Sequence, residues 1–229
     1  YGGPIHVVHT RDEMLPAVDR LRRETLLGFD IEKRPAFRKG EYHPPAILQL
    51  AGRDAVYIFQ LRYLGFPEEL ADILASPRII KAGVAVNRDI QELVELGAFT
   101  PRNFVDLGYC AERHGIQHHG LRGLAALLLA GRVSKGSRLT NWERPHLPPA
   151  ELSYAATDAW LGRQLYEALK KHGCIKDSRG RSLKGLMRKC LRLVTGGRKG
   201  QEPLHAPLHA SRPHHRPRGR RRALSRRAE

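Results

Sequence analysis

The sequence lacks the features of a secreted disulfide scaffold. Its 229 residues include only three cysteines, Cys110, Cys174 and Cys190, which form no C-x-x-C pair and leave one over. An odd and scattered set of cysteines argues against a disulfide framework and favours a reducing compartment. No signal-peptide pattern opens the chain either. We therefore expect an intracellular, cytoplasmic location.

Long hydrophobic runs are also missing. The longest aliphatic run covers residues 124–130, far fewer than the roughly 20 apolar residues that a membrane-spanning helix needs. We therefore expect no membrane partner. The length suits one α/β domain with an extension, and such a chain can bury a core without disulfides or structural metals.

Positive charge is abundant but unevenly distributed. The formal net charge is +17, of which residues 176–229 carry +14, with 17 Lys and Arg against 3 Asp and Glu. Residues 1–175 are almost balanced at +3. A basic tail of this kind is expected to bind phosphate backbones without reading sequence. The alternative is a solvated extension without a role.

These shifts in composition predict three parts of the chain. Residues 1–175 form the main domain. Residues 176–195 space apolar side chains at helical intervals between basic ones, which predicts a short basic amphipathic helix. Residues 196–229 are rich in Pro, His and Arg and predict a disordered tail, because they offer little to bury in a core.

Hydrophobic patterning in the main domain predicts an α/β fold. Expected helices cover residues 10–23, opened by the capping box Thr10-x-x-Glu13, then 66–75, 87–97 with Asn87 as its cap, 121–130 and 148–172. We expect a mixed sheet of about five strands, one of them antiparallel, flanked by these helices. Six segments are candidates for these strands: residues 4–9, 26–31, 46–50, 56–61, 78–84 and 103–107.

Two carboxylates lie at the end of the strand that we expect over residues 26–31. Asp30 and Glu32 are two residues apart, so they share one face of the strand. At the edge of a buried sheet they would repel each other and be costly to ionise. A hard divalent cation such as Mg²⁺ or Mn²⁺ removes that cost. The alternative is an exposed acidic strand end.

Three further polar residues fall where they can join this pair. Asp89 follows a strand, where α/β sites assemble, although it could simply stabilise a helix N-terminus. Tyr154 and Asp158 are four residues apart, on one face of a helix. A buried Tyr–Asp hydrogen bond is the alternative there. Four carboxylates from two strand ends and two helices favour a functional site.

The motifs that carry these residues are Gly28-Phe29-Asp30-Ile31-Glu32, Gly83-x5-Asp89 and Tyr154-Ala155-Ala156-Thr157-Asp158. Together they resemble the tyrosine branch of the DEDD 3′–5′ exonucleases, in the ribonuclease H-like superfamily. Residues 4–172 are similar to the Werner exonuclease domain and to the catalytic domain of ribonuclease D. One departure is Glu151, where many relatives have glutamine. The resemblance implies a ribonuclease H-like fold.

It also implies a mechanism with two divalent cations, Mg²⁺ or Mn²⁺. Asp30, Glu32 and Asp158 would bind one ion, and Asp30 would bridge to a second that Asp89 supports. Tyr154 would orient the attacking water, because a phenol with a pKa near ~10 is a poor base at neutral pH. The substrate would be the 3′ end of a nucleic acid, and the product a 5′-mononucleotide.

Candidate substrate contacts are Glu32, Gln49 and Lys135. Phe37 or Phe29 could stack on a terminal base, although core packing is favoured for Phe29. Ordinary polar or surface roles are the alternatives for Gln49 and Lys135. Two other functions stay open: a non-catalytic nucleic-acid-binding or adaptor protein on the same fold, and a metal-dependent endonuclease. The sequence does not distinguish DNA from RNA or define an oligomeric state.

Overall fold

The structure, a computed structural model, describes residues 1–133 and 140–175. The chain divides into two units, Tyr1–Ser182 and Leu183–Glu229, and all described residues belong to the first. The predicted helix at residues 176–195 and the predicted tail at 196–229 lie outside the described residues. Both stay predictions, as does the three-part division of the chain.

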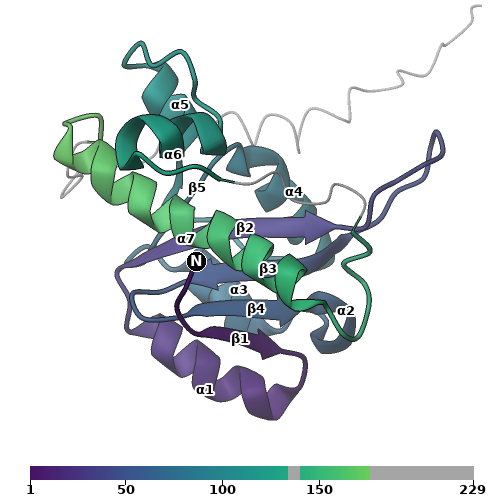
Figure 1. Ribbon diagram of the computed structural model, residues 1–229. Coiled ribbons are helices and arrows are strands. Elements are labelled where there is room, and N and C mark those ends of the chain that lie inside the picture. The colour runs from purple at the N-terminus through teal and green to yellow at the C-terminus, as the bar shows by residue number, and fades with distance from the viewer. Residues whose placement is uncertain (134–139, 176–229) are drawn as a thin grey trace, which may run out of the picture. The chain divides into compact units, whose positions relative to one another are not determined.

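A six-stranded mixed sheet forms the centre of the first unit (Figure 1). Its strand order is β1-β4-β3-β2-β5-β6. Strand β3 is antiparallel to both of its neighbours, and the remaining pairings are parallel. The strands are β1 (Ile5–Val8), β2 (Leu26–Lys33), β3 (Pro45–Ala51), β4 (Val56–Gln60), β5 (Ile80–Gly83) and β6 (Phe104–Asp106).

Helices cover both faces of this sheet. Helices α1, α3 and α4 pack on one face, and α5, α6 and α7 pack on the other (Figure 1). None of the described helices is long and apolar enough to cross a membrane. The helices are α1 (Arg11–Arg22), α2 (Leu61–Leu64), α3 (Glu68–Ala75), α4 (Val86–Leu96), α5 (Leu107–Glu112), α6 (Leu121–Leu129) and α7 (Pro149–Lys171).

The predicted α/β class and single antiparallel strand are confirmed, with six strands in place of about five. The capping box at Thr10 and Glu13 is also present. One cap was wrong: α4 begins at Val86, so Asn87 lies inside its first turn. Its cap is Ala85, in the left-handed region at φ 60°, and the Ala85 N–H donates to Asp106 at 3.2 Å.

Helix α7 crosses β2 and β5 at very close range because both surfaces lack side chains there. A Cβ atom at Gly28 would overlap the carbonyl oxygen of Ala159, and one at Gly162 would clash with the carbonyl oxygen of Ala82. The Arg163 guanidinium then donates to the carbonyl oxygen of Leu26. This crossing fixes the height of α7 above the end of β2.

Replacing Gly28 with alanine should therefore displace α7. The added methyl has no space beside the helix backbone, and such overpacking is expected to lower the free energy of unfolding by about 3 kcal/mol. Urea denaturation measures this loss. Gly120→Ala is the control, because a Cβ atom there meets nothing within 4 Å. Equal stability of the two variants would contradict the close crossing.

Candidate active site

Three carboxylates converge where β2 ends beneath α7. Asp30 and Glu32 come from β2, and Asp158 comes from α7. Each offers one oxygen atom, and these three oxygens lie within 4.8 Å of one another. Residues more than 120 positions apart in sequence therefore form one cluster.

Strand alternation explains how β2 supplies two of these groups. Phe29 and Ile31 point into the core on the side of α1, α3 and α4. Gly28, Asp30 and Glu32 therefore face the opposite side, toward α7. Because Gly28 admits the helix backbone, Asp158 approaches the two carboxylates from above.

The three carboxyl groups are held in an environment that opposes their ionisation. Burial, followed by the charges of Glu32, Asp158 and Asp89, raises the pKa of Asp30 well above its usual value. Burial and the charges of Asp158 and Asp89 raise the pKa of Glu32 to about 7. Like charges at such range favour protonation unless a cation compensates them.

Asp89 lies on the rim of this cluster. It is in the first turn of α4 and does not belong to the group whose oxygens lie within 4.8 Å. Its charge nevertheless raises the pKa values of Asp30 and Glu32. The pKa of Asp89 itself is raised to about 6 by burial and by the charge of Glu92, while Lys33 and Arg88 oppose the shift.

Tyr154 is one turn before Asp158 on the same helix. Its ring stacks against Trp142, with centroids 6.3 Å apart. Burial, then the charges of Asp158 and Glu32 and a hydrogen bond with Asp158, raise its pKa, so the phenol stays protonated at neutral pH. The pKa of Asp158 is raised by burial, partly offset by that hydrogen bond and by the charge of Arg122.

These residues fit a hard divalent cation. Three carboxylate oxygens at one point match the preference of Mg²⁺ and Mn²⁺ for oxygen ligands. The raised pKa values show that the cluster carries unbalanced negative charge when it is ionised. A bound cation would remove that imbalance, so Asp30, Glu32 and Asp158 could hold a metal ion.

The other predicted substrate contacts have different outcomes. Gln49 is fully buried on β3, and its contact with substrate stays a prediction. A position two residues from the end of an interior strand, between strands on both sides, explains this burial. Lys135 lies outside the described residues, so its role stays a prediction.

Sequence reasoning missed several charged residues around the cluster. Glu92, one turn after Asp89 on α4, binds Lys33 at 2.7 Å and Arg88 at 3.0 Å. The i, i+3 spacing from Asp89 was a signal for its position. Arg122 on α6 acts on Asp158 through its charge, and no local motif marks it.

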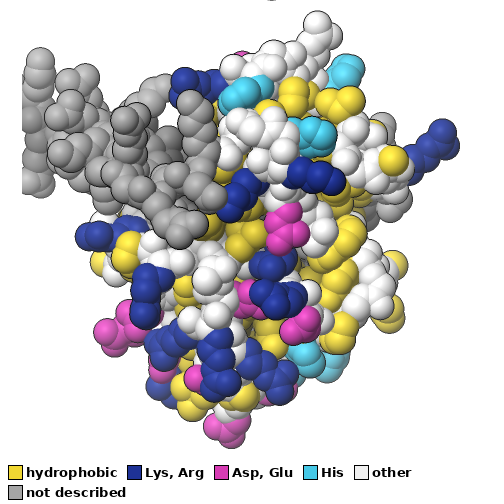
Figure 2. Space-filling model, turned by 90° about the vertical axis from the view of Figure 1, so that its left-hand side faces the viewer, with side chains coloured by type: hydrophobic (Ala, Val, Ile, Leu, Met, Phe, Trp, Pro, Cys, Tyr) yellow, Lys and Arg dark blue, Asp and Glu magenta, His cyan; other side chains and the backbone are white. Residues whose placement is uncertain are grey.

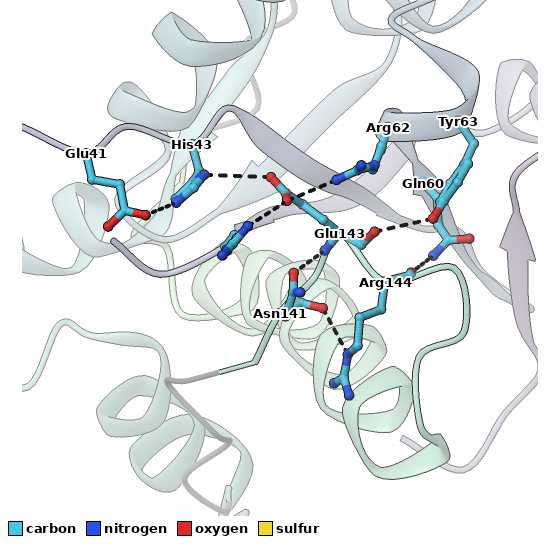
Figure 3. Close-up of polar contacts among 9 residues, drawn as sticks. Glu41, His43, Gln60, Arg62, Tyr63, Asn141, Glu143 and Arg144 are labelled. Carbon is cyan, nitrogen blue, oxygen red and sulfur yellow. Dashed lines mark hydrogen bonds and ion pairs between the residues drawn. The ribbon is translucent and has the colours of Figure 1, made fainter. Parts of the chain in front are cut away.

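Another missed residue, Glu143, lies in the segment before α7 and contacts α2 and the loop between β2 and β3 (Figure 3). Its carboxylate pairs with Arg62 at 3.1 Å and lies 3.8 Å from a ring nitrogen of His43. Next to it, Arg144 binds Glu151 in the first turn of α7, at 2.6 and 2.8 Å. Glu151, at the position where many relatives have glutamine, thus forms an ion pair that fixes the beginning of α7.

The sequence is similar to known proteins over most of the described domain. A family model described as 3′-5′ exonuclease matches residues 5–173. A 3′-5′ exonuclease of Arabidopsis thaliana is 29% identical over 167 residues, covering 69% of this chain and 58% of that protein. A ribonuclease D of Gluconacetobacter diazotrophicus is 28% identical over 166 residues, covering 71% and 42%.

Solved structures share the fold. The structure of Trypanosoma brucei RNase D in complex with RNA U12 superposes with a TM-score of 0.67 at 18% identity, covering 92% of this chain and 77% of that one. The chain spans about half the length of the two curated relatives. Because the family model covers most of the described domain, the chain belongs to the 3′-5′ exonuclease family, which confirms the resemblance seen in its motifs.

Proposed function

We propose that the protein is a metal-dependent 3′–5′ exonuclease that releases 5′-mononucleotides from nucleic acid. The observation that carries this proposal is the convergence of three carboxylate oxygens within 4.8 Å at the sheet edge of a 3′-5′ exonuclease domain. A pair of divalent cations, Mg²⁺ or Mn²⁺, would polarise the phosphate and activate water.

The chain's own residues take distinct roles in this proposal. Asp30, Glu32 and Asp158 would hold one cation, and Asp30 with Asp89 would serve the second. The rim position of Asp89 suits a contact through water. Glu32 would also contact the terminal nucleotide. Protonated Tyr154, with its hydroxyl beside Asp158, would orient the attacking water.

Removing the Tyr154 hydroxyl tests its role. Tyr154→Phe should lower kcat about a hundredfold, because a misplaced nucleophile loses the benefit of orientation, while Mn²⁺ affinity stays unchanged. Single-turnover cleavage and metal titration measure the two quantities. Tyr63→Phe, at a half-exposed tyrosine on α2, is the matched control. Unchanged turnover in Tyr154→Phe would remove the residue from the mechanism.

The direction and product of cleavage need a direct test. A 5′-labelled single strand should shorten one nucleotide at a time in Mg²⁺ or Mn²⁺, and EDTA should stop the reaction. Chromatography should identify the released product as 5′-mononucleotides. Cuts in a circular single strand would instead indicate an endonuclease. Binding without any cleavage would indicate the non-catalytic alternative.

We propose further that residues 196–229 strengthen binding to the phosphate backbone. They contain 10 Lys and Arg against 2 Glu, and each phosphate contact on a single strand adds about 0.7 to the salt slope of log K. Deleting them should weaken binding and flatten that slope, with little effect on single-turnover cleavage at saturating enzyme. Identical binding across salt concentrations would exclude an electrostatic role.

A further inference from the structure

The loop between β2 and β3, residues 34–44, projects beyond the body of the sheet (Figure 1). We call it the arm. It begins two residues after Glu32, so its base lies beside the carboxylate cluster. Two of the largest exposed hydrophobic side chains of the described chain lie on it, Phe37 at 69% exposure and Tyr42 at 56%.

Contacts with both sides of the site fix the base of the arm. On one side the Tyr42 hydroxyl donates to Glu95 of α4 at 3.5 Å, and the Lys33 ammonium lies 5.6 Å from the Tyr42 ring centre. On the other side Arg34 approaches Glu143 at 3.5 Å. The arm therefore stands between the helix that carries Asp89 and the segment that leads into α7.

The tip of the arm is an ordered turn. One carboxylate oxygen of Glu41 accepts the backbone N–H groups of Phe37 at 2.8 Å and Arg38 at 3.1 Å. Gly40 at φ 86° allows the chain to reverse. Phe37, Arg38 and Lys39 are all exposed, and in the described part of the chain neither cation forms an ion pair. The turn thus presents an aromatic ring and two free positive charges to solvent.

The opposite end of the sheet has a different character. Figure 2 shows the side of the molecule at that end, where Lys and Arg side chains are interspersed with Asp and Glu. Arg23, which follows α1 and precedes β2, pairs with Asp19 at 2.6 Å. An aromatic side chain beside free cations is the combination that binds single-stranded nucleic acid, because bases stack on the ring and cations neutralise phosphates.

We propose that the tip of the arm, Phe37 with Arg38 and Lys39, is a docking surface for single-stranded nucleic acid, where Phe37 stacks on an unpaired base. This rests on the proposed function, since the arm would hold the strand whose 3′ end occupies the carboxylate cluster. It adds a preference for single strands over duplex that the cluster itself does not set.

Binding to the whole chain carrying Asp30→Asn, in EDTA, tests the proposal without cleavage. Adding Phe37→Ala should weaken binding of a fluorescent 12-nucleotide single strand about tenfold, and Phe37→Trp should retain it. Adding Arg38→Ala with Lys39→Ala should lower the salt slope of log K by about 1.4. Arg20→Ala with Arg53→Ala removes the same charge at the opposite end of the sheet and should change the slope less.

The proposal is overturned if Phe37→Ala binds the single strand as its parent does, or if a blunt duplex loses as much affinity. An equal change of slope in the Arg20 and Arg53 variant would also overturn it. Failure of the proposed function is separate, because it shows as absent trimming by the unsubstituted chain in Mn²⁺ while the binding differences persist.

A second inference concerns Gln49, whose side chain is fully buried on β3. Both of its polar side-chain atoms lack a hydrogen-bond partner among the described residues. Gln49 is the cross-strand neighbour of Asp30, and directly opposed residues point to the same face of a sheet. An unpartnered buried amide costs stability, and Asp30 is the cross-strand neighbour that could accept a hydrogen bond from it.

We infer that Gln49 is a positioning residue for Asp30, and that its side-chain N–H donates to the Asp30 carboxylate when that group is ionised around a cation. Outer hydrogen bonds of this kind orient metal ligands, and their loss weakens metal binding about 10- to 100-fold. This inference also rests on the proposed function.

Isothermal titration of Mn²⁺ into the whole chain tests it. Gln49→Leu should weaken Mn²⁺ binding at least about tenfold without lowering the stability of the metal-free protein. Gln60→Leu is the control, because Gln60 is also buried on a strand and has one unpartnered atom. Unchanged Mn²⁺ affinity in Gln49→Leu overturns the inference, as does an equal loss in Gln60→Leu. Trimming assays of the unsubstituted chain report on the proposed function independently.

Discussion

Substituting Asp30 with asparagine is expected to reduce metal-dependent cleavage by at least about a thousandfold, because a bound cation supplies several kcal/mol of charge stabilisation in the transition state. Burial and the charges of three other carboxylates raise the pKa of Asp30 well above its usual value. Asparagine keeps the size of the side chain but removes the charge that would bridge two cations. Single-turnover cleavage of a labelled oligonucleotide in Mn²⁺ measures the effect.

In the absence of metal, Asp30→Asn is expected to make the folded protein more stable. Removing one of several buried like charges relieves repulsion, so metal-free Asp30→Asn should unfold at a higher temperature than the parent at pH 8. Asp54→Asn, an exposed acid in the turn between β3 and β4, is the control and should change neither quantity. A folded Asp30→Asn protein with near-normal cleavage would reject the site.

Most of the fold could be predicted because its signals are local. The residues of β2 alternate between apolar side chains and Gly28, Asp30 and Glu32, and this places both carboxylates on one face. The spacing of Tyr154 and Asp158 likewise defines one face of α7. The structure adds the reason these faces meet, which is the contact of Gly28 with the backbone of Ala159.

Other features depend on contacts that no local pattern encodes. Asn87 has the chemistry of a cap, but Asp106 from β6 holds Ala85 as the first flanking residue of α4. Gln49 is a polar residue near a predicted site, and only the pairing of β3 with both β2 and β4 shows that it is buried. Asp89 is in the first turn of α4, as expected, but tertiary packing places it outside the group of three carboxylates.

The buried carboxyl groups of the site should make the stability of the fold depend on pH in the direction opposite to that of carboxyl groups with lowered pKa values. The Glu32 carboxyl has a pKa raised to about 7 by burial and by Asp158 and Asp89, so the folded protein binds its proton more tightly than the unfolded chain does. The bound proton on Glu32 therefore stabilises the fold fully below pH 4.5, the pKa of this group in the unfolded chain. This stabilisation is lost as the pH rises through about 7. Asp89, raised to about 6, acts in the same direction.

The expected result is that the metal-free protein loses stability between about pH 5 and pH 8, with Glu32 alone contributing about 3 kcal/mol. Saturating Mn²⁺ at pH 8 should restore stability, by about 2.7 kcal/mol at a hundredfold excess over Kd, because a cation replaces the protons. Urea denaturation at several pH values, with EDTA or Mn²⁺, measures both effects. Glu32→Gln should flatten the metal-free profile. If the metal-free protein were equally stable at both pH values, the carboxylates would not be electrostatically coupled, and the physical reason for a cation at this sheet edge would be lost.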